Sequence, residues 1–266
     1  PLWAQRCAAL KEAGIIEGAD TAAQARFAYE AMKASGWTDA ALHAGALSVG
    51  FDLWRAVAVT YASAYGRYGF GEAPCGNRYS ALGADFAPRA ATAAERAAWW
   101  ADGSGIPPGA GVHIVEPDAA APLATLQCLR DLWTGEGGHA ARVQQGVAQT
   151  RAGLPRAGLP VVVIHGTDDG LIPPAFSSAP YVRTAQAAGR DVRYWQVRNA
   201  QHFDAFLGLP DYGARYLPLL PYVYEALDRV NAHLDGRAPL PVDAVIETTP
   251  RGAGKALQAA DLAMPR

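Results

Sequence analysis

The chain has 266 residues, of which half are apolar and 18% are charged, so it is long enough and apolar enough to bury a sizeable core. Its formal net charge of −2, with no block of like charges, argues against a nucleic-acid or membrane-surface partner, since both usually require a basic stripe. No apolar run approaches the ~20 residues that a membrane-spanning helix needs, so we expect neither a nucleic-acid nor a membrane partner.

Residues 1 to about 155 are rich in alanine and predict mainly helices. The predicted helices cover residues 21–35, 38–65, 122–135 and 139–153. The first has Asp20 and Thr21 as candidate N-cap residues and Gly36 at its end. The second is apolar nearly all round, which is typical of a helix packed between others. Between residues 66 and 111 glycine and proline indicate turns and irregular structure.

From residue 157 to residue 236 the pattern changes to alternating strands and helices. The predicted elements are a strand over 160–166, a helix over 175–189, a strand over 191–197 and a helix over 219–236. The continuous β-branched run of the first strand is typical of a strand buried on both faces of a parallel sheet. Because two strands do not make a stable sheet, we expect the remaining strands to lie upstream of Pro1. Residues 237–266 are Pro-rich, and we expect this tail to lie over the surface.

Two polar side chains follow the two predicted strands directly. Asp169 lies in HGTDDGLIPP after the first strand, and His202 lies in NAQHFDAF after the second. A β-α-β crossover brings the carboxyl ends of adjacent parallel strands to one edge of the sheet, so we expect the two side chains to lie within hydrogen-bonding reach. A carboxylate there can hold an imidazole by its Nδ1–H and stabilise the imidazolium that forms when a serine gives up its proton. The order acid then base is that of α/β hydrolases, in which the nucleophile precedes both.

Each of these residues also has a structural interpretation. Asp169 could instead cap the helix that follows it, and Asp168 is better explained as a turn residue, because the Gly-x-x-Asp-x-x-x-Pro spacing favours Asp169 as the acid. His202 could be a loop histidine with a structural hydrogen bond. Asp204 is more often a helix cap than a participant in catalysis. His165 ends the first strand and could line the site, but a structural hydrogen bond is its favoured role.

The sequence contains no Gly-x-Ser-x-Gly nucleophile elbow. GALSVG around Ser48 comes nearest, but it has one residue too many before the serine and lies in a predicted helix. Ser104, in GSG, lies in a predicted loop and is no better a candidate. We therefore expect the nucleophile and the oxyanion hole upstream of Pro1, and we expect this chain alone to be catalytically incomplete.

The remaining histidines and the cysteines predict no metal site and no cofactor. Four histidines lack any ligand spacing such as HExxH and are interpreted as structural: His43, His113, His139 and His233. Cys7, Cys75 and Cys128 are widely spaced and form no CxxC pair, so we expect neither a disulfide framework nor a zinc site. An oxidising compartment would permit one bridge, for example Cys7 to Cys75.

One enzyme family is similar to this sequence in several long runs. The runs are HGTDDGLIPPAFSSAPYV, YWQVRNAQHFDAFL, YLPLLPYVYEALDRVNAHLDGRAPLP, TTPRGAG, GFDLWRAVAVTYASAYGRYG and PCG at 74–76. They resemble the C-terminal part of D-(−)-3-hydroxybutyrate oligomer hydrolases, which are bacterial serine esterases that act after the polyhydroxybutyrate depolymerases. The resemblance implies an α/β-hydrolase fold and hydrolysis of linear 3-hydroxybutyrate dimers and oligomers to monomers. Asp169 and His202 match the positions expected for the acid and the base.

The resemblance also implies an organisation, partners and a location. Residues 1–156 would form a helical cap or lid ahead of the C-terminal core strands and helices at 157–236. Its aromatic side chains could line a groove for a polyester chain, although packing in the core of the cap is favoured. These side chains are Trp3, Phe51, Trp54, Tyr61 and Tyr65. The implied partners are an oligoester substrate and the N-terminal, nucleophile-bearing half of the same enzyme, and the implied location is secreted or periplasmic. The alternatives are another esterase or peptidase of the same fold, or a non-catalytic binding fragment.

Overall fold

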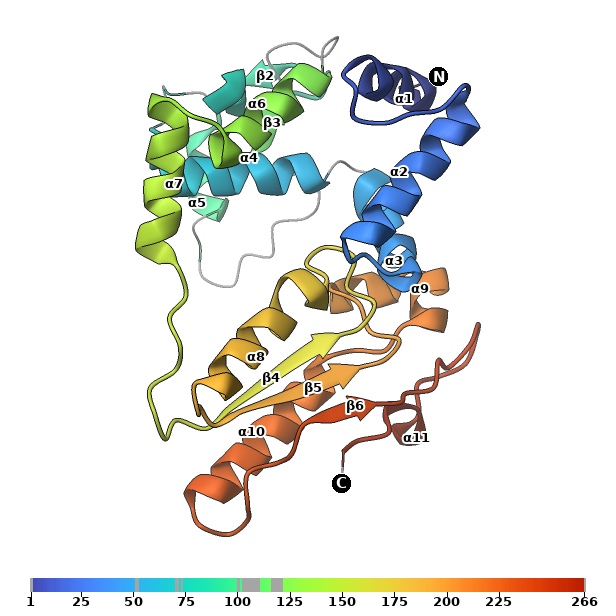
Figure 1. The fold of residues 1–266 in the computed structure, drawn as a ribbon, viewed down its shortest axis with the longest axis vertical. Coiled ribbons are helices and arrows are strands. Elements are labelled where there is room, and N and C mark those ends of the chain that lie inside the picture. Colours follow the sequence, from blue (N-terminus) through green and yellow to red (C-terminus); the bar gives the residue numbers. More distant parts are fainter. Residues whose placement is uncertain are drawn as a thin grey trace. The chain divides into compact units, whose positions relative to one another are not determined.

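The chain folds into two compact units, seen in the computed structural model of Figure 1. The structure describes residues 2–50, 53–69, 72, 74–99, 101, 111–115 and 122–265. One unit comprises Pro1–Ile15 and Asp52–Ala152, and the other comprises Ile16–Phe51 and Gly153–Arg266. This division differs from the predicted boundary at residue 156, because the segment from residue 16 to residue 51 belongs to the same unit as the C-terminal strands and helices. None of the helices in the described ranges combines the length and the apolarity that crossing a bilayer requires.

The first unit is a helical bundle with a small antiparallel sheet. Its elements are α1 (Leu2–Glu12), α4 (Leu53–Gly66), β1 (Arg78–Leu82), β2 (Pro88–Arg89), α5 (Ala93–Trp99), β3 (His113–Val115), α6 (Pro122–Thr134) and α7 (Gly138–Thr150). The buried side chains of Val59, Leu129 and Val143 join α4, α6 and α7 into one core. The strands pair in the order β2-β1-β3, and β1 and β2 lie in the range 66–111 that the sequence predicted as irregular.

A disulfide in the first unit joins Cys75 to Cys128, with the two Cα atoms 5.7 Å apart. Cys75 lies in the short 3-10 helix Pro74–Gly76, which packs against α6, the helix that carries Cys128. Cys7 is buried and has no disulfide partner. The bridge that the sequence left open is therefore Cys75–Cys128 and not the example Cys7–Cys75, because tertiary packing brings Cys128 to Cys75.

The second unit contains a parallel sheet and the helices that pack on it. Its elements are α2 (Thr21–Ser35), α3 (Asp39–Gly50), β4 (Val161–Gly166), α8 (Ser178–Ala187), β5 (Val192–Val197), α9 (Pro210–Arg215), α10 (Leu220–Leu234), β6 (Ala244–Ile246) and α11 (Ala259–Leu262). As predicted, Asp20 caps α2 by accepting a hydrogen bond from the Ala23 amide, and Gly36 ends that helix in the left-handed conformation. The single helix predicted over 38–65 is wrong, since α3 ends at Gly50 and α4 belongs to the other unit.

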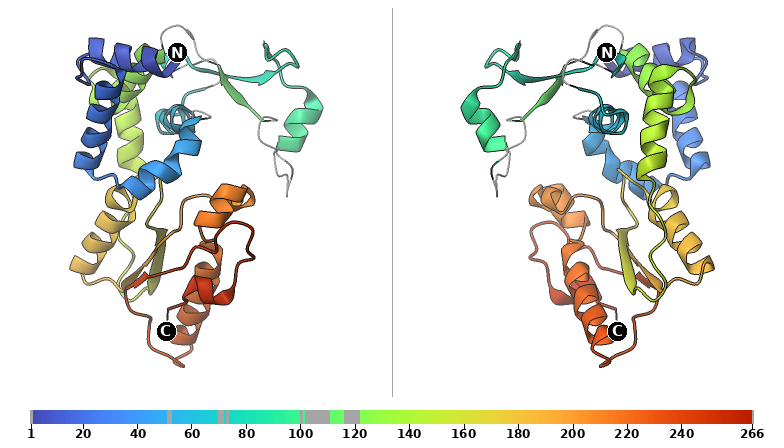
Figure 2. Two further views of the ribbon diagram at one scale, coloured as in Figure 1. Left: turned by 90° about the vertical axis from the view of Figure 1, so that its right-hand side faces the viewer. Right: turned by 90° about the vertical axis from the view of Figure 1, so that its left-hand side faces the viewer.

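The parallel sheet has the strand order β4-β5-β6 and lies between α8 and α10 (Figure 2). Both predicted strands, β4 and β5, are present and pair in parallel, with Val161 opposite Val192. The third strand comes from the segment that we expected to lie over the surface, and places Ile246 opposite Val197. The Trp195 indole donates a hydrogen bond to the Val242 carbonyl at 3.0 Å, which helps to hold this segment against the sheet edge.

Alternation along the strands decides which side chains share a face of the sheet. Tyr194 of β5 packs with Val182 of α8, whereas Trp195 packs with Tyr222 of α10 on the opposite face. His165 lies two residues beyond Val163, a residue of the face that α8 covers. Alternation therefore directs the His165 side chain towards the beginning of α8.

Candidate active site

The carboxyl ends of β4 and β5 meet at one edge of the sheet, where backbone contacts join the loops that follow them. The Thr167 amide donates to the Val197 carbonyl at 2.8 Å, and the Asp168 amide donates to the Ala200 carbonyl at 3.0 Å. Gly166 allows this approach, because a Cβ atom there would lie 2.3 Å from the Ala200 carbonyl oxygen. The glycine at the end of β4 thus lets the two loops pack together.

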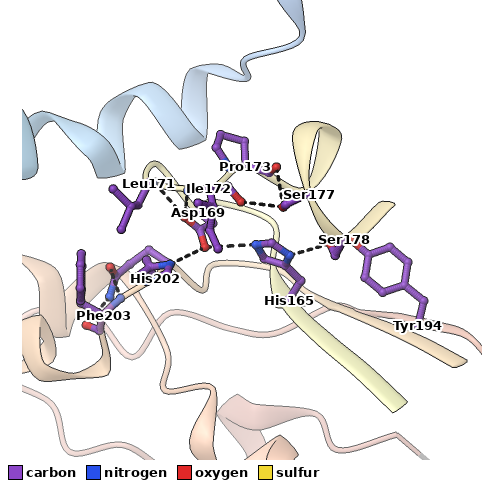
Figure 3. Close-up of polar contacts among 11 residues, drawn as sticks. His165, Asp169, Leu171, Ile172, Pro173, Ser177, Ser178, Tyr194, His202 and Phe203 are labelled. Atoms are coloured by element: carbon purple, nitrogen blue, oxygen red, sulfur yellow. Dashed lines mark hydrogen bonds and ion pairs between the residues drawn. The ribbon is translucent and has the colours of Figure 1, made fainter. Parts of the chain in front are cut away.

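Asp169 and His202 are brought together at this edge (Figure 3). The Nδ1 atom of His202 lies 2.9 Å from Oδ2 of Asp169, as the strand order predicted. Since an ionised carboxylate only accepts hydrogen bonds, His202 carries its proton on Nδ1, and Nε2 is left to accept another proton. The Asp169 side chain is 3% exposed and the His202 side chain is 31% exposed, so the imidazole is the member of the pair that a reactant can reach.

The Asp169 carboxylate accepts four N–H groups. Oδ1 accepts from the Leu171 and Ile172 amides, both at 2.8 Å. Oδ2 accepts from His202 and also from Nε2 of His165 at 3.1 Å. Asp169 therefore closes its own turn and does not cap the helix that follows.

These hydrogen bonds decide the charge of Asp169. Burial, the largest single influence, raises the pKa of this carboxyl group. The hydrogen bonds from His165, His202 and the two backbone amides together outweigh burial and hold the pKa well below its usual range. Asp169 is therefore a carboxylate at neutral pH and can stabilise a positive charge on the imidazole of His202.

The hydrogen-bond network continues from His165 away from the pair. Nδ1 of His165 lies 2.6 Å from the Ser178 hydroxyl, which lies 2.5 Å from the Tyr194 hydroxyl. The hydrogen bonding predicted for His165 is confirmed, but the sequence reasoning missed Ser178 and Tyr194. The alternation of side chains on β4 and β5 carried a signal for Tyr194, because it places this residue with His165 on the face that α8 covers, and Ser178 is the first residue of α8 itself.

The loop that carries His202 is fixed on both sides of the histidine. The Gln201 side chain is buried and closes on the backbone of Phe203, donating to its carbonyl at 2.6 Å and accepting from its amide at 2.9 Å. The Asp204 carboxylate accepts from the Leu219 amide at 2.9 Å and from the Leu220 amide at 3.1 Å. The capping role predicted for Asp204 is confirmed, and the helix it caps is α10.

Helix α3 packs directly against the turn that holds Asp169. A Cβ atom at Gly170 would lie 2.4 Å from the Gly45 nitrogen of α3, so the backbone of the turn touches the backbone of the helix. Ser48 lies within α3 and is 4% exposed, not on a strand-to-helix turn of the kind that presents a nucleophile. Asp168 accepts from the Thr167 hydroxyl at 2.7 Å, as expected of a turn residue, and burial raises the pKa of its carboxyl group.

Several of the other predicted side chains have partners within their own unit. Ser104 and Phe51 lie outside the described residues. Of the remaining aromatics, Tyr65 packs on the core of the first unit, while Trp3 and Tyr61 are more than half exposed. Three of the four histidines interpreted as structural have neighbouring partners: His43 contacts Arg215, His139 contacts Tyr68 and His233 contacts the Ala238 carbonyl. His113 lies in β3. Within the described part of the chain, no three His, Cys, Asp or Glu side chains are grouped as metal ligands would be.

Comparison with known proteins gives one consistent family. The sequence profile of the 3HB-oligomer hydrolase family matches residues 2–265. The chain is 39% identical over 95% of its length to a D-(-)-3-hydroxybutyrate oligomer hydrolase of Paracidovorax citrulli. Proteins of the same name are 39% identical over 93% of the chain in Albidiferax ferrireducens and 37% identical over 98% in Azoarcus sp.. The chain spans only about two fifths of these relatives, namely 39%, 38% and 41% of their lengths. No solved structure matches the chain.

Proposed function

Because the chain belongs to the 3HB-oligomer hydrolase family, we propose that it supplies the acid and the base of a Ser-His-Asp carboxylic ester hydrolase, Asp169 and His202. The proposed substrates are linear dimers and oligomers of 3-hydroxybutyrate, and the products are monomers. The observation that carries the proposal is the 2.9 Å contact between the buried Asp169 carboxylate and the accessible His202 imidazole at the carboxyl ends of two parallel strands.

The proposed reaction is acyl transfer in two halves. A serine hydroxyl attacks the ester carbonyl while Nε2 of His202 accepts the hydroxyl proton. The same nitrogen then returns the proton to the departing hydroxy acid, which leaves an acyl-enzyme. In the second half His202 accepts a proton from water, which attacks the acyl group, and the proton finally returns to the serine. Asp169 holds the ring by Nδ1 and stabilises the imidazolium in each half, and no step of this scheme needs a cofactor.

We propose further that the sheet is part of an α/β-hydrolase core whose other strands, with the serine, belong to the rest of a longer protein. Two observations support this proposal. Among the described residues β4 pairs only with β5, and its run Val161–Ile164 is apolar on both faces yet only partly buried. On α10, Leu227 and Leu234 are 61% and 67% exposed, more than is usual for large apolar side chains of a finished core. The two-fifths coverage of the relatives is consistent with such a missing part.

The proposed location is secreted or periplasmic, in a bacterium like those of the relatives. The Cys75–Cys128 disulfide supports this, because disulfides persist mainly in oxidising compartments.

The proposed function is tested in the full-length enzyme with a fluorophosphonate probe and a substrate panel. Labelling of a serine, abolished by His202→Ala, is expected, since the probe reacts only with an activated hydroxyl. Faster hydrolysis of 3-hydroxybutyrate dimer than of peptides or long-chain lipid esters is expected from the panel. A protein that is not labelled and turns over none of these substrates would be a binding fragment, and a labelled protein that prefers peptides would belong to another hydrolase class.

A further inference from the structure

A second histidine shares the carboxylate oxygen that holds His202. His165 Nε2 and His202 Nδ1 lie 3.1 Å and 2.9 Å from the same atom, Oδ2 of Asp169 (Figure 3). The His165 side chain is 9% exposed, compared with 31% for His202, so the two rings differ in access to solvent. Only His202 is open to a reactant.

When the His165 ring is neutral, the hydrogen bonds through it all run in one direction. Because the Asp169 carboxylate only accepts, the Nε2 atom of His165 carries the proton. Nδ1 of a neutral ring is then an acceptor, and the Ser178 hydroxyl at 2.6 Å donates to it. Ser178 in turn accepts from the Tyr194 hydroxyl at 2.5 Å. The chain therefore runs in one direction, from the tyrosine through Ser178 and His165 to Asp169.

This arrangement leaves the Asp169 carboxylate no freedom to rotate. Two backbone amides hold Oδ1, and His165 holds Oδ2 from the side opposite the reacting ring. His202 changes its protonation only at Nε2 during catalysis, so its Nδ1–H and the His165 Nε2–H both stay on Oδ2. His165 is buried between Ser178 and Asp169 and is the donor of the two whose ring carries no reacting proton.

We propose that His165 is a positioning residue of the catalytic pair. Its Nε2–H fixes Oδ2 of Asp169 for His202, and Ser178 holds the ring at Nδ1. This inference rests on the proposed function. It assigns to His165 a part in the reaction through its Nε2–H donor, beyond a general contribution to folding.

Two conservative substitutions test the two nitrogen atoms of His165 one at a time. The glutamine amide nitrogen stands three bonds from Cβ, as Nε2 does, whereas the asparagine amide oxygen stands two bonds from Cβ, as Nδ1 does. His165→Gln therefore keeps the donor to Asp169 and gives up the contact with Ser178. His165→Asn keeps an acceptor for Ser178 and gives up the donor to Asp169. If His165 served only to stabilise the fold, His165→Gln would not be expected to keep a higher kcat than His165→Asn.

The experiment measures kcat and KM for 3-hydroxybutyrate dimer in the full-length enzyme, with thermal unfolding of each variant. His165→Asn should lower kcat by about 10- to 100-fold, the effect of losing one charge-assisted hydrogen bond, with little change in KM. His165→Gln should restore most of that loss. His233→Asn, which alters a partly exposed histidine of α10 that contacts only the Ala238 carbonyl among the contacts described, is the matched control. Near-normal kcat in His165→Asn, or equal losses in both His165 variants, would overturn the proposal.

Two further variants keep the outcome interpretable. If His165→Asn does not fold, Ser178→Ala decides, because it leaves the ring in place but removes the donor to Nδ1. A lower kcat at unchanged KM in Ser178→Ala supports the proposal, and an unchanged kcat rejects it. His202→Ala in the same series tests the premise: if it keeps full activity, the proposed function fails, whatever the His165 variants show.

Discussion

Replacing Asp169 with asparagine should abolish most of the activity, because the site needs a group that accepts at both oxygens. The carboxylate takes four N–H donors, two on each oxygen. An amide has one oxygen, which would stay on the Leu171 and Ile172 amides, each 2.8 Å away. Its NH₂ group would then face His202 and force Nδ1 to accept. The proton of the ring would move to Nε2, the atom that must receive the serine proton.

The size of this effect follows from the tautomer. A histidine held in the wrong tautomer costs a Ser-His-Asp enzyme about 10⁴-fold in kcat, which corresponds to about 5 kcal/mol of transition-state stabilisation. The assay is the initial rate of 3-hydroxybutyrate dimer hydrolysis by the full-length enzyme. Asp168→Asn is the matched control, since the Asp168 carboxylate bonds to the Thr167 hydroxyl and not to a histidine. Equal activity in the two asparagine variants would refute the reasoning.

Three other changes test separate parts of the structure. The low pKa of Asp169 in the folded state means that its ionisation stabilises the protein fully above the unfolded pKa of about 4 and progressively less as the pH falls below it. The difference in unfolding free energy between wild type and Asp169→Asn, measured in urea, should therefore be constant from pH 7 to about pH 5 and shrink below about pH 4; a difference that stays constant at the lowest pH at which the wild type is folded would contradict the assignment. Gly166→Ala should cost more than about 2 kcal/mol of unfolding free energy, because the new Cβ would lie 2.3 Å from the Ala200 carbonyl oxygen; a variant as stable as wild type would show that the loops pack differently. Cys128→Ser removes a disulfide between residues 53 positions apart and should lower the free energy of unfolding by up to about 4 kcal/mol under oxidising conditions. Cys7→Ser should lower it less, and equal losses of unfolding free energy in the two variants would argue against the Cys75–Cys128 pairing.

The sequence was sufficient to predict the meeting of Asp169 and His202, because one geometric rule connects them. A β-branched run, a helix and a second strand make a parallel crossover, and such a crossover delivers both strand ends to one edge. The rule brings the two residues to one edge, and the loop contacts at Gly166 and Gln201 then set the 2.9 Å distance between them.

The elements that escaped prediction depend on contacts between distant residues. The strand Ala244–Ile246 is too short to show a period, and it is a strand only because the edge of β5 is available to it. The segment from residue 16 to residue 51 belongs to the unit of the sheet, where Gly45 allows α3 to touch Gly170 in the turn after β4, and no local pattern reveals this contact. The pairing of Cys75 with Cys128 likewise depends on the packing of α6. Within the site, the sequence predicted a hydrogen bond for His165, whereas the partners of that bond required the structure.

The most direct measurement is kcat of the full-length His202→Ala variant with 3-hydroxybutyrate dimer, recorded beside its thermal unfolding curve. With the base removed and the fold retained, kcat should fall by about 10⁴-fold or more. A folded His202→Ala enzyme that turns over the dimer at nearly the wild-type rate would contradict the assignment of His202 as the base, and with it the account of the site.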